Sequence, residues 1–351
     1  MAATACILST STLPKNATKK SSSSNTGLII GVIFGGVKQT QTRAATTTVS
    51  FHYDNENVVY QPNDSWDRNL PTRAIRTGTG PLKTILGNKP LATGTYGEVW
   101  CETYGGQQVA NKRMKSRAPR QGQKFIDEII QMSQLDSDYI VKFVGASWTK
   151  PIEIECVVEY MDLGDLRSYL VDRSPAQFTW DQKYQCILSI VRGLVYLHTY
   201  RPPIIHRDLK SRNVLLDSNK GTKLTDFGTS RIAEEDDLMT NGIGTYQWMA
   251  PEVIAGTGYS APADIYSFGI ILSEFCTHEV PYAGMRHPQT GKLLAQHFLL
   301  SEVREGRLYP SFDGENVPAW VRDVAMQCLQ LHEADRPTAL ELSAILSRVK
   351  P

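Results

Sequence analysis

The pattern of apolar and polar positions changes from short alternating runs to helical stripes near the middle of the chain. The alternating runs predict five strands, at residues 84–93, 98–104, 107–114, 140–148 and 152–160. Gly105-Gly106 supplies a turn between the second and third of these strands. One helix is predicted at residues 121–135, where Phe125, Ile129 and Met132 fall on one face. The first part of the folded region is therefore mainly sheet.

Beyond residue 162 the apolar period becomes helical. One stripe follows the spacing of a helix face that packs on a core, through Ile187, Ile190, Val191, Leu194 and Leu197. Residues 264–276 are apolar almost all round, which predicts a helix buried on every side. A sheet with one helix, followed by a helical half, indicates an α+β fold.

The first 80 residues differ in composition from the rest. Residues 1–50 contain five Lys or Arg and no Asp or Glu, and they are rich in Ser and Thr. Such a segment cannot bury enough apolar surface to offset its conformational entropy. Residues 51–80 are polar, with several turn signals, and are interpreted as a linker. We therefore expect a low-complexity segment at residues 1–80 and a folded domain at residues 81–351.

One apolar run, residues 27–37, interrupts this N-terminal segment. As a helix it would reach about 16 Å, which is shorter than the roughly 30 Å hydrocarbon core of a bilayer. The run is compatible with a signal-peptide core, with a truncated receptor-type membrane helix, or with a disordered Gly-rich patch. A membrane association through residues 27–37 is one of the alternatives that the sequence leaves open.

Charge and cysteine content exclude several classes of function. The formal net charge is +1, which gives no overall case for binding nucleic acid. The six cysteines are scattered and contain no C-x-x-C pair, so they favour neither a disulfide framework nor a zinc site. This usage is typical of a reducing compartment such as the cytoplasm, where most cysteines are small buried apolar residues.

The segment from His206 to Asn213 concentrates chemically useful side chains between two apolar pairs. Asp208 can accept a proton from a hydroxyl group, Asn213 can ligate a metal, and Lys210 can balance the charge of a phosphate. Its alternative interpretation is a charged surface turn between two buried segments, and the remaining motifs must decide between them.

A second group of motifs precedes this segment. Gly94 and Gly97 lie in the first predicted turn, where the absence of a Cβ lets backbone amides approach phosphates. Lys112 follows on the third predicted strand, in the sequence Val109-Ala110-Asn111-Lys112. Strand alternation places Asn111 on the face opposite Ala110 and Lys112, so Asn111 should affect packing more than phosphate contact.

Taken in order, these motifs resemble those of the protein kinase family. H-R-D-L-K-S-R-N matches the family's catalytic loop, and Asp226-Phe227-Gly228 and Ala250-Pro251-Glu252 match its D-F-G and A-P-E motifs. The glycine loop departs at its first position, which is Ala92, whereas Gly94, Gly97 and Val99 fit. The resemblance covers about residues 84–348.

The resemblance implies a two-lobed protein kinase fold. Residues 81–161 would form an N-lobe with a five-stranded antiparallel sheet and one main helix, and residues 162–351 a mostly helical C-lobe. It also implies that the domain uses ATP and Mg2+ and acts on protein substrates. A buried arginine, Arg336, is expected to pair with Glu252.

Each site residue then has an expected role. The expected catalytic residues are Asp208, Lys210, Asn213, Lys112 and its ion-pair partner Glu128. Asn213 and Asp226 are the expected metal ligands. The expected ATP-binding residues are Leu91, Ala92, Gly94, Gly97, Val99, Ala110, Lys112, Val158, Glu159, Met161 and Leu215. Among them, Val158 would be the gatekeeper and Leu91, Val99, Ala110 and Leu215 would surround adenine.

Two residues favour serine and threonine as acceptors. Lys210 lies two positions after Asp208, as in serine/threonine kinases, and Thr245 is expected to bond Asp208 and Lys210. Some segments, such as Trp248-Met-Ala-Pro-Glu252 and residues 264–269, are similar to tyrosine kinases. This mixture resembles the tyrosine-kinase-like group of serine/threonine kinases, which includes the mixed-lineage and Raf-like kinases.

A regulatory phosphate is expected between residues 226 and 252. Arg207 precedes the catalytic aspartate, and in the family such an arginine commonly contacts a phosphate on the activation segment. Thr240 is the favoured position for that phosphate, because its negative charge could bond Arg207. The acidic run at residues 234–237 is the competing explanation, since it could supply the negative charge itself.

Two other functions are weighed against an active soluble kinase. Ala92 and Asn111 depart from the family pattern and are the support for a pseudokinase that serves as a scaffold. The run at residues 27–37 is the support for a membrane receptor kinase whose outer domain is absent from this sequence.

Overall fold

The computed structural model describes residues 53–54, 57–58, 88–94, 97–115, 119–147, 154–227 and 245–349. The chain divides into two compact units, residues 1–48 and 49–351, and all described residues belong to the second unit. The apolar run at residues 27–37 lies outside the described residues. Among the residues that are described, no helix has both the length and the apolar character needed to cross a membrane.

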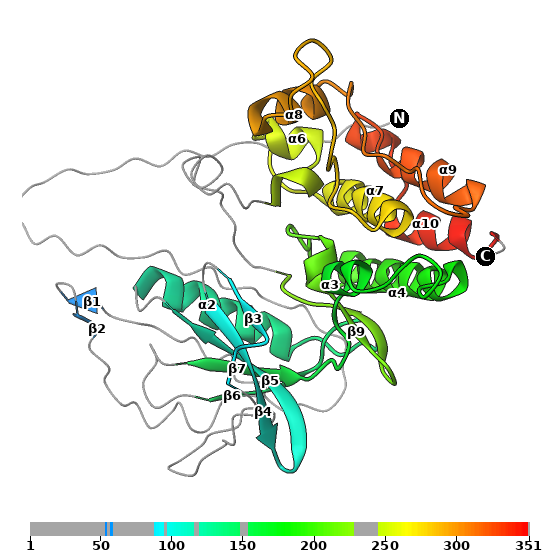
Figure 1. Cartoon of the computed structure of the whole chain (residues 1–351). Helices are drawn as coiled ribbons and strands as arrows, with labels where there is room; N and C mark the ends of the chain where they lie inside the picture. The colour runs from blue at the N-terminus through cyan, green and yellow to red at the C-terminus, as the bar shows by residue number, and fades with distance from the viewer. Residues whose placement is uncertain are drawn as a thin grey trace, which may run out of the picture. The chain divides into compact units, whose positions relative to one another are not determined.

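A five-stranded antiparallel sheet forms the N-terminal lobe, as the sequence predicts (Figure 1). Its spatial order is β3-β4-β5-β7-β6. The strands are β3 (Ala92–Thr93), β4 (Gly97–Tyr104), β5 (Gln107–Met114), β7 (Glu155–Glu159) and β6 (Phe143–Ser147). The helix α2 (Pro119–Ser133) packs beside the sheet and contacts β6. Phe125, Ile129 and Met132 are buried there, so the predicted apolar face of this helix is confirmed.

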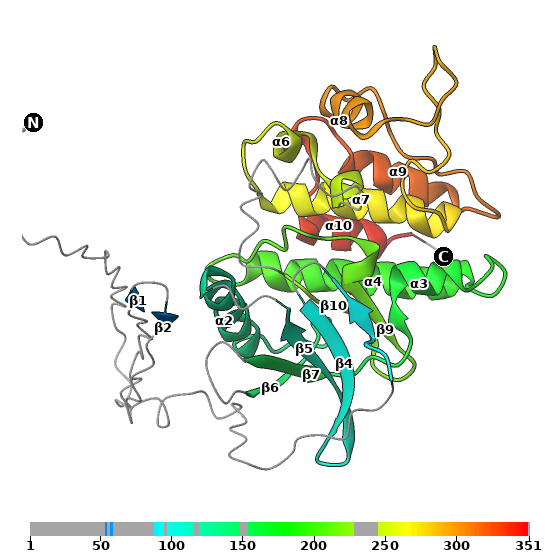
Figure 2. The same cartoon turned by 60° about the vertical axis from the view of Figure 1, so that its left-hand side comes forward.

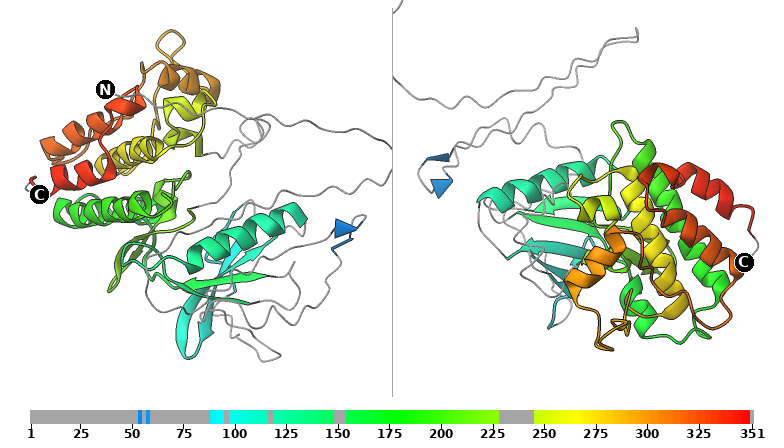
Figure 3. Two further views of the ribbon diagram at one scale, coloured as in Figure 1. Left: turned by 180° about the vertical axis from the view of Figure 1, so that it is seen from behind. Right: turned by 90° about the horizontal axis from the view of Figure 1, so that it is seen from above.

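The helical lobe is built around two long helices, α4 (Trp180–Thr199) and α7 (Ala261–Thr277). A capping box at Thr179 and Gln182 starts α4 by satisfying backbone N–H groups of its first turn. Figures 2 and 3 show the neighbouring helices against this pair. They are α3 (Leu166–Val171), α6 (Pro251–Ile254), α8 (Gln296–Arg304), α9 (Ala319–Cys328) and α10 (Ala339–Leu346).

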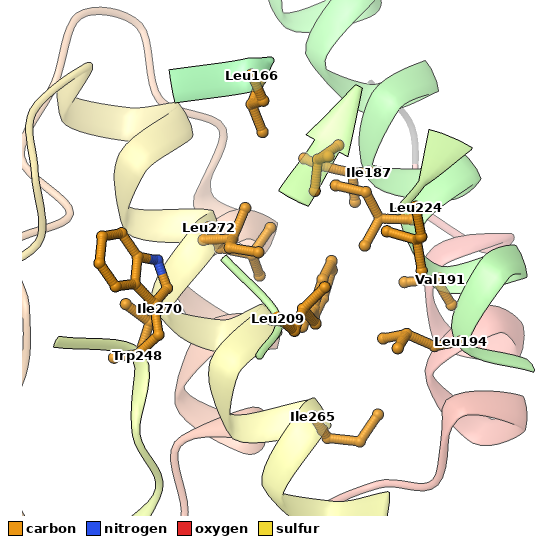
Figure 4. Packing of buried hydrophobic residues seen from close by; sticks show 14 of the residues in the cluster. Leu166, Ile187, Val191, Leu194, Leu209, Leu224, Trp248, Ile265, Ile270 and Leu272 are labelled. Atoms are coloured by element: carbon orange, nitrogen blue, oxygen red, sulfur yellow. The ribbon is translucent and has the colours of Figure 1, made fainter. Parts of the chain in front are cut away.

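The predicted stripe and the predicted buried helix together form the core of this lobe. The stripe residues of α4 are fully or almost fully buried, and α7 is buried along most of its length. Figure 4 shows Leu209 of the catalytic loop among side chains of α4 and α7, including Ile187, Leu194 and Ile265. The loop that carries the candidate chemistry is therefore anchored in the apolar core.

Three features of the fold differ from the sequence prediction. The first strand of the sheet is confined to Ala92–Thr93, and residues 84–87 lie outside the described residues. The expected linker contains a short antiparallel pair, β1 (Tyr53–Asp54) and β2 (Asn57–Val58). A separate sheet has the order β10-β9-β8, with β10 (Gly221–Leu224), β9 (Val214–Asp217) and β8 (Gly164–Asp165). Its strands are only two to four residues long, too short for alternation to reveal.

Candidate functional site

The two faces of β5 carry different chemistry. Lys112 lies opposite Val99 on β4 and Cys156 on β7, and Ala110 lies opposite Val158 on β7. Residues directly opposite in an antiparallel pair share a face, so these side chains line one side of the sheet. This face contains Val99, Ala110 and Val158, three of the residues expected to contact adenine.

Asn111 points to the other face, as strand alternation predicts. Its side-chain amide donates to Glu102 Oε2 at 3.0 Å and to Glu155 Oε2 at 2.8 Å. Arg113, two residues along the same strand, forms ion pairs with the same two carboxylates. The polar residue at the position where the family usually has an aliphatic one therefore bonds β4 to β7, away from Lys112.

Lys112 joins the two lobes. Its Nζ lies 2.7 Å from Glu128 Oε1 on α2 and 2.7 Å from Asp226 Oδ1 in the helical lobe. The ion pair between Lys112 and Glu128, expected from the resemblance, is thus present. The direct contact between Lys112 and Asp226 was not predicted, because a separation of 114 residues leaves no sequence signal.

The electrostatics of this triad favour the charged forms of Lys112 and Asp226. Burial alone would lower the pKa of Lys112, but the carboxylates of Asp226 and Glu128 outweigh burial and raise it. The same ammonium group lowers the pKa of Asp226. Burial raises the pKa of Glu128, and Lys112 partly offsets that rise. Two carboxylates share one ammonium, so the triad carries a net negative charge that suits a cation.

The catalytic loop is held from below by one aspartate on α7. Asp264 accepts the backbone N–H of His206 at 2.8 Å and that of Arg207 at 2.9 Å. It also bonds the ring of His198 on α4 at 2.9 Å. Arg207 adopts φ of 68°, a left-handed conformation that these two bonds help to stabilise. Sequence analysis did not single out Asp264, although a carboxylate in an otherwise apolar helix is a usable signal.

Asp208, Lys210 and Asn213 converge at the end of this loop. Lys210 Nζ donates to Asp208 Oδ2 at 2.8 Å, and Asn213 Nδ2 donates to the same oxygen at 3.1 Å. Asn213 Nδ2 also donates to the backbone oxygen of Asp208 at 2.8 Å, which leaves its amide oxygen as the metal-binding atom. His206 and Ser211 are completely buried. The alternative interpretation of a charged surface turn is therefore wrong.

The glycine loop is shaped by close backbone approach at one position. A Cβ on Gly97 would lie 2.4 Å from the backbone oxygen of Arg113, so no other residue fits there. Gly94 is different, because a Cβ there would meet nothing closer than 3.9 Å. Ala92 is exposed in β3 opposite Val99, where its methyl group is tolerated. The departure at Ala92 thus falls where the fold does not require glycine.

The hinge residues are fixed through one side chain. Glu159 Oε1 accepts from Lys223 Nζ at 2.7 Å and from the backbone N–H of Lys142 at 2.7 Å. These bonds commit the Glu159 carboxylate to the protein, so any contact with a nucleotide would come from the backbone. Met161 is buried, Leu215 is half-buried in β9, and Leu91 remains exposed.

The arginine near the C-terminus pairs as expected. Arg336 Nη1 lies 2.6 Å from Glu252 Oε1, and Arg336 Nη2 lies 2.7 Å from Glu252 Oε2. This two-point ion pair ties the A-P-E segment to the loop before α10. Three other calls lie outside the described residues or side chains: Gly228, Thr240, and the bond expected from Thr245, which begins the short 3-10 helix η3 (Thr245–Trp248).

Comparison with known proteins agrees with this geometry. Residues 87–345 match the family model described as protein kinase domain. The chain is 37% identical to serine/threonine-protein kinase STY46 of Arabidopsis thaliana over 206 residues, covering 58% of this chain and 35% of that protein. It is 32% identical to STY17 of the same plant, covering 80% of this chain and 47% of that protein.

A membrane-associated name also occurs among the relatives. Wall-associated receptor kinase-like 5 of Arabidopsis thaliana is 35% identical over 257 residues, covering 70% of this chain and 35% of that protein. The chain thus spans less than half the length of these curated relatives. The match over residues 87–345, together with the site described above, places the chain in the protein kinase family, with a domain of the serine/threonine type.

Proposed function

We propose that this chain transfers the γ-phosphoryl group of ATP to serine and threonine hydroxyls of protein substrates. The observation that carries the proposal is the joined arrangement of Lys112, Glu128 and Asp226 across the two lobes, beside the Asp208–Asn213 loop. Protein kinases require this ion pair and the aspartate at the metal to be in place together.

The residues fit a nucleotide with a divalent metal. The only atoms near Gly97 are backbone, so phosphates could approach amide groups without obstruction from a side chain. Asp226 and Asn213 offer hard oxygen ligands, and Mg2+ characteristically combines one or two such ligands with substrate phosphates. When bound, ATP supplies the phosphoryl group and the metal neutralises charge on its phosphates.

Each residue of the chain then has a defined task. Lys112, oriented by Glu128, holds the α- and β-phosphates. Asn213 and Asp226 hold the metal. Asp208 orients the substrate hydroxyl and accepts its proton, and Lys210 balances charge on the γ-phosphate. The adenine ring would lie among Leu91, Val99, Ala110 and Leu215, as the sequence predicts.

The experiment is phosphate transfer from labelled ATP by the purified full chain. Three peptide libraries, containing only serine, only threonine or only tyrosine as acceptor, are compared in the presence and absence of Mg2+. We expect label on serine and threonine that depends on Mg2+. Label on tyrosine alone would refute the acceptor class. A complete lack of transfer would favour the pseudokinase, whose sequence support is Ala92 and Asn111.

Regulation by a phosphate on Thr240 is a second part of the proposal. Arg207 lies on the catalytic loop, where a phosphate from the activation segment could bond it. The test compares Thr240→Ala with wild-type protein treated with phosphatase. We expect both to lose activity, and full activity in both would favour the acidic run at residues 234–237 instead.

We also propose that the kinase domain works in the cytoplasm and that residues 27–37 are the candidate membrane contact. The relative named as a receptor kinase and the apolar character of the run support the second point. Fractionation of cells expressing the full chain or the chain lacking residues 27–37 tests it. Equal amounts of both proteins in the membrane fraction would refute a contact through this run.

A further inference from the structure

One carboxylate outside the catalytic group lies at the meeting point of three elements of the helical lobe. Glu274, near the end of α7, is completely buried. Its Oε1 accepts from Ser211 Oγ at 2.7 Å and from Arg167 Nη1 at 3.1 Å. Its Oε2 accepts from Trp248 Nε1 at 2.9 Å. All three donors are themselves buried.

The donors come from segments that meet the substrate in different ways. Ser211 follows Lys210 and begins the short 3-10 turn η2 (Ser211–Asn213), so it lies between two residues of the proposed mechanism. Trp248 ends η3, directly before the A-P-E segment. Arg167 belongs to α3, which begins just after the hinge.

Ser211 and Trp248 bond different oxygens of the same group. A displacement of either segment would therefore move or strain the carboxylate that the other segment uses. Trp248 is further restrained, because its backbone oxygen accepts from Ser267 Oγ of α7 at 2.8 Å. Figure 4 shows the Trp248 side chain close to α7, near Ile270.

The charge of this carboxylate is needed for all three bonds. An ionised carboxylate has acceptor sites for three donors, whereas a protonated one gives up a site to its own proton. Arg167 from α3 is the charged group that faces Glu274. The catalytic loop contributes a hydroxyl group and η3 an indole N–H. His278, at the end of α7, reaches the cluster through its backbone oxygen, which accepts from Arg167.

We propose that Glu274 is a positioning residue that couples the catalytic loop to residues 245–250, so that Asp208 and Lys210 keep a fixed place relative to the bound peptide. Glu274 touches neither nucleotide nor peptide in this proposal and acts through Ser211 and Trp248. The effect on turnover rests on the proposed kinase function, whereas the coupling between the two segments does not.

The coupling is tested first without any activity, by hydrogen–deuterium exchange on the full chain. Ser211→Ala removes the bond on the loop side, and Trp248→Phe removes the bond on the other side. We expect Ser211→Ala to speed exchange in residues 245–250 and Trp248→Phe to speed exchange in residues 209–214. If each variant loosens only its own segment, the coupling is refuted.

Turnover provides the second measurement. At saturating ATP and peptide, we expect Ser211→Ala and Trp248→Phe each to lower kcat by roughly tenfold, and the double variant to lower it by less than the product of the two effects. The KM for ATP should stay unchanged. Multiplicative effects in the double variant would mean that the two segments act independently and would overturn the proposal.

The pH profile distinguishes positioning from a merely structural role. Burial raises the pKa of Glu274 to about 7, with bonds from Ser211, Trp248 and Arg167 opposing the rise. The wild-type kcat should therefore fall as pH drops through about 7, and Glu274→Gln should lack this limb. A limb that persists in Glu274→Gln would overturn the proposal.

A matched variant controls for general damage to α7. Ser273 is the preceding residue and is also buried, but its hydroxyl bonds only the backbone oxygen of Ile270, at 2.7 Å. Ser273→Ala should leave exchange, kcat and the pH profile unchanged. An inactive wild-type protein would refute the kinase function, and the exchange measurement would still decide the coupling.

Discussion

Lys112 and Asp226 lie 114 positions apart in the chain, and their side chains meet at 2.7 Å. The contact links strand β5 of the sheet to the segment that follows β10 in the helical lobe. Asp226 still exposes 46% of its side chain, so it remains accessible to a metal although it bonds Lys112. A nucleotide with its metal would therefore compete with Lys112 for one oxygen of Asp226.

We expect Asp226→Asn to abolish phosphoryl transfer. The amide keeps the shape of the side chain but removes the charge that attracts both Lys112 and the metal. The measurement is kcat/KM with a serine peptide, and a loss smaller than about tenfold, equivalent to 1.4 kcal/mol, would contradict the assigned role. Lys112→Met should have the same effect on activity.

The matched control for Asp226→Asn is Asp323→Asn. Asp323 is exposed on α9, away from every residue of the proposed mechanism. The substitution makes the same chemical change and should leave both activity and the thermal midpoint unaltered. Equal losses in the two variants would show that the assay reports damage unrelated to the site.

Arg336→Met should strongly destabilise the helical lobe. The Arg336 side chain has no exposed surface and forms a two-point ion pair with Glu252. Removing one partner of a buried pair leaves an uncompensated charge, which costs about 3–5 kcal/mol. Urea unfolding measures this cost. Arg336→Lys should restore little stability, because one ammonium group cannot reproduce the planar two-point contact.

The comparison for this pair is an exposed ion pair of the same residue types. Arg307 bonds Glu302 through two nitrogens, at 2.8 and 3.0 Å, but more than half of the Arg307 side chain is exposed. Arg307→Met should leave the urea midpoint within experimental error. If both arginines prove equally costly to replace, burial does not explain the effect at Arg336.

The sequence allowed the local parts of the site to be predicted better than the distant ones. Lys112, Asp208 and Asn213 stand in short motifs, so their positions follow from register along one strand or loop. Asp264 and Glu274 were not predicted as partners of the catalytic loop. Their bonds depend on how α7 packs beneath that loop, more than 50 residues away in the chain.

Asn111→Asp should destabilise the sheet in a pH-dependent manner. Asn111 donates to Glu102 and Glu155, and an aspartate would instead place a third carboxylate beside these two. Like charges raise the pKa of the new carboxyl in the folded state, so the folded protein binds its proton more tightly than the unfolded chain. The cost is therefore present near pH 7 and shrinks as pH falls towards about 4, the ordinary value of aspartate.

Thermal midpoints of wild-type protein and Asn111→Asp at several pH values test this prediction. Gln108→Glu is the control, because it converts an amide into a carboxylate on the same strand at an exposed position. It should change the midpoint little at any pH. A cost of Asn111→Asp that stays constant from pH 7 to 4 would mean that charge repulsion is not its cause.

Lys183 should make the stability of the wild-type protein rise with pH in an alkaline range. Its side chain is buried in α4, with Nζ 4.6 Å from the centre of the Trp180 ring. Burial lowers the pKa of Lys183 to about 8. The unfolded chain, with a lysine pKa of about 10.4, therefore binds more protons than the folded protein between these values. Stability must then increase as pH rises through this window, because the buried group becomes neutral.

Replacing Lys183 by methionine isolates this contribution. Methionine keeps a long apolar side chain against Trp180 but cannot titrate. Other groups also titrate above pH 8, so the informative quantity is the difference in unfolding free energy between wild-type protein and Lys183→Met. That difference should shift in favour of the wild type as pH rises from 8 to 10. A difference that does not change with pH would show that Lys183 keeps its ordinary pKa in the folded protein.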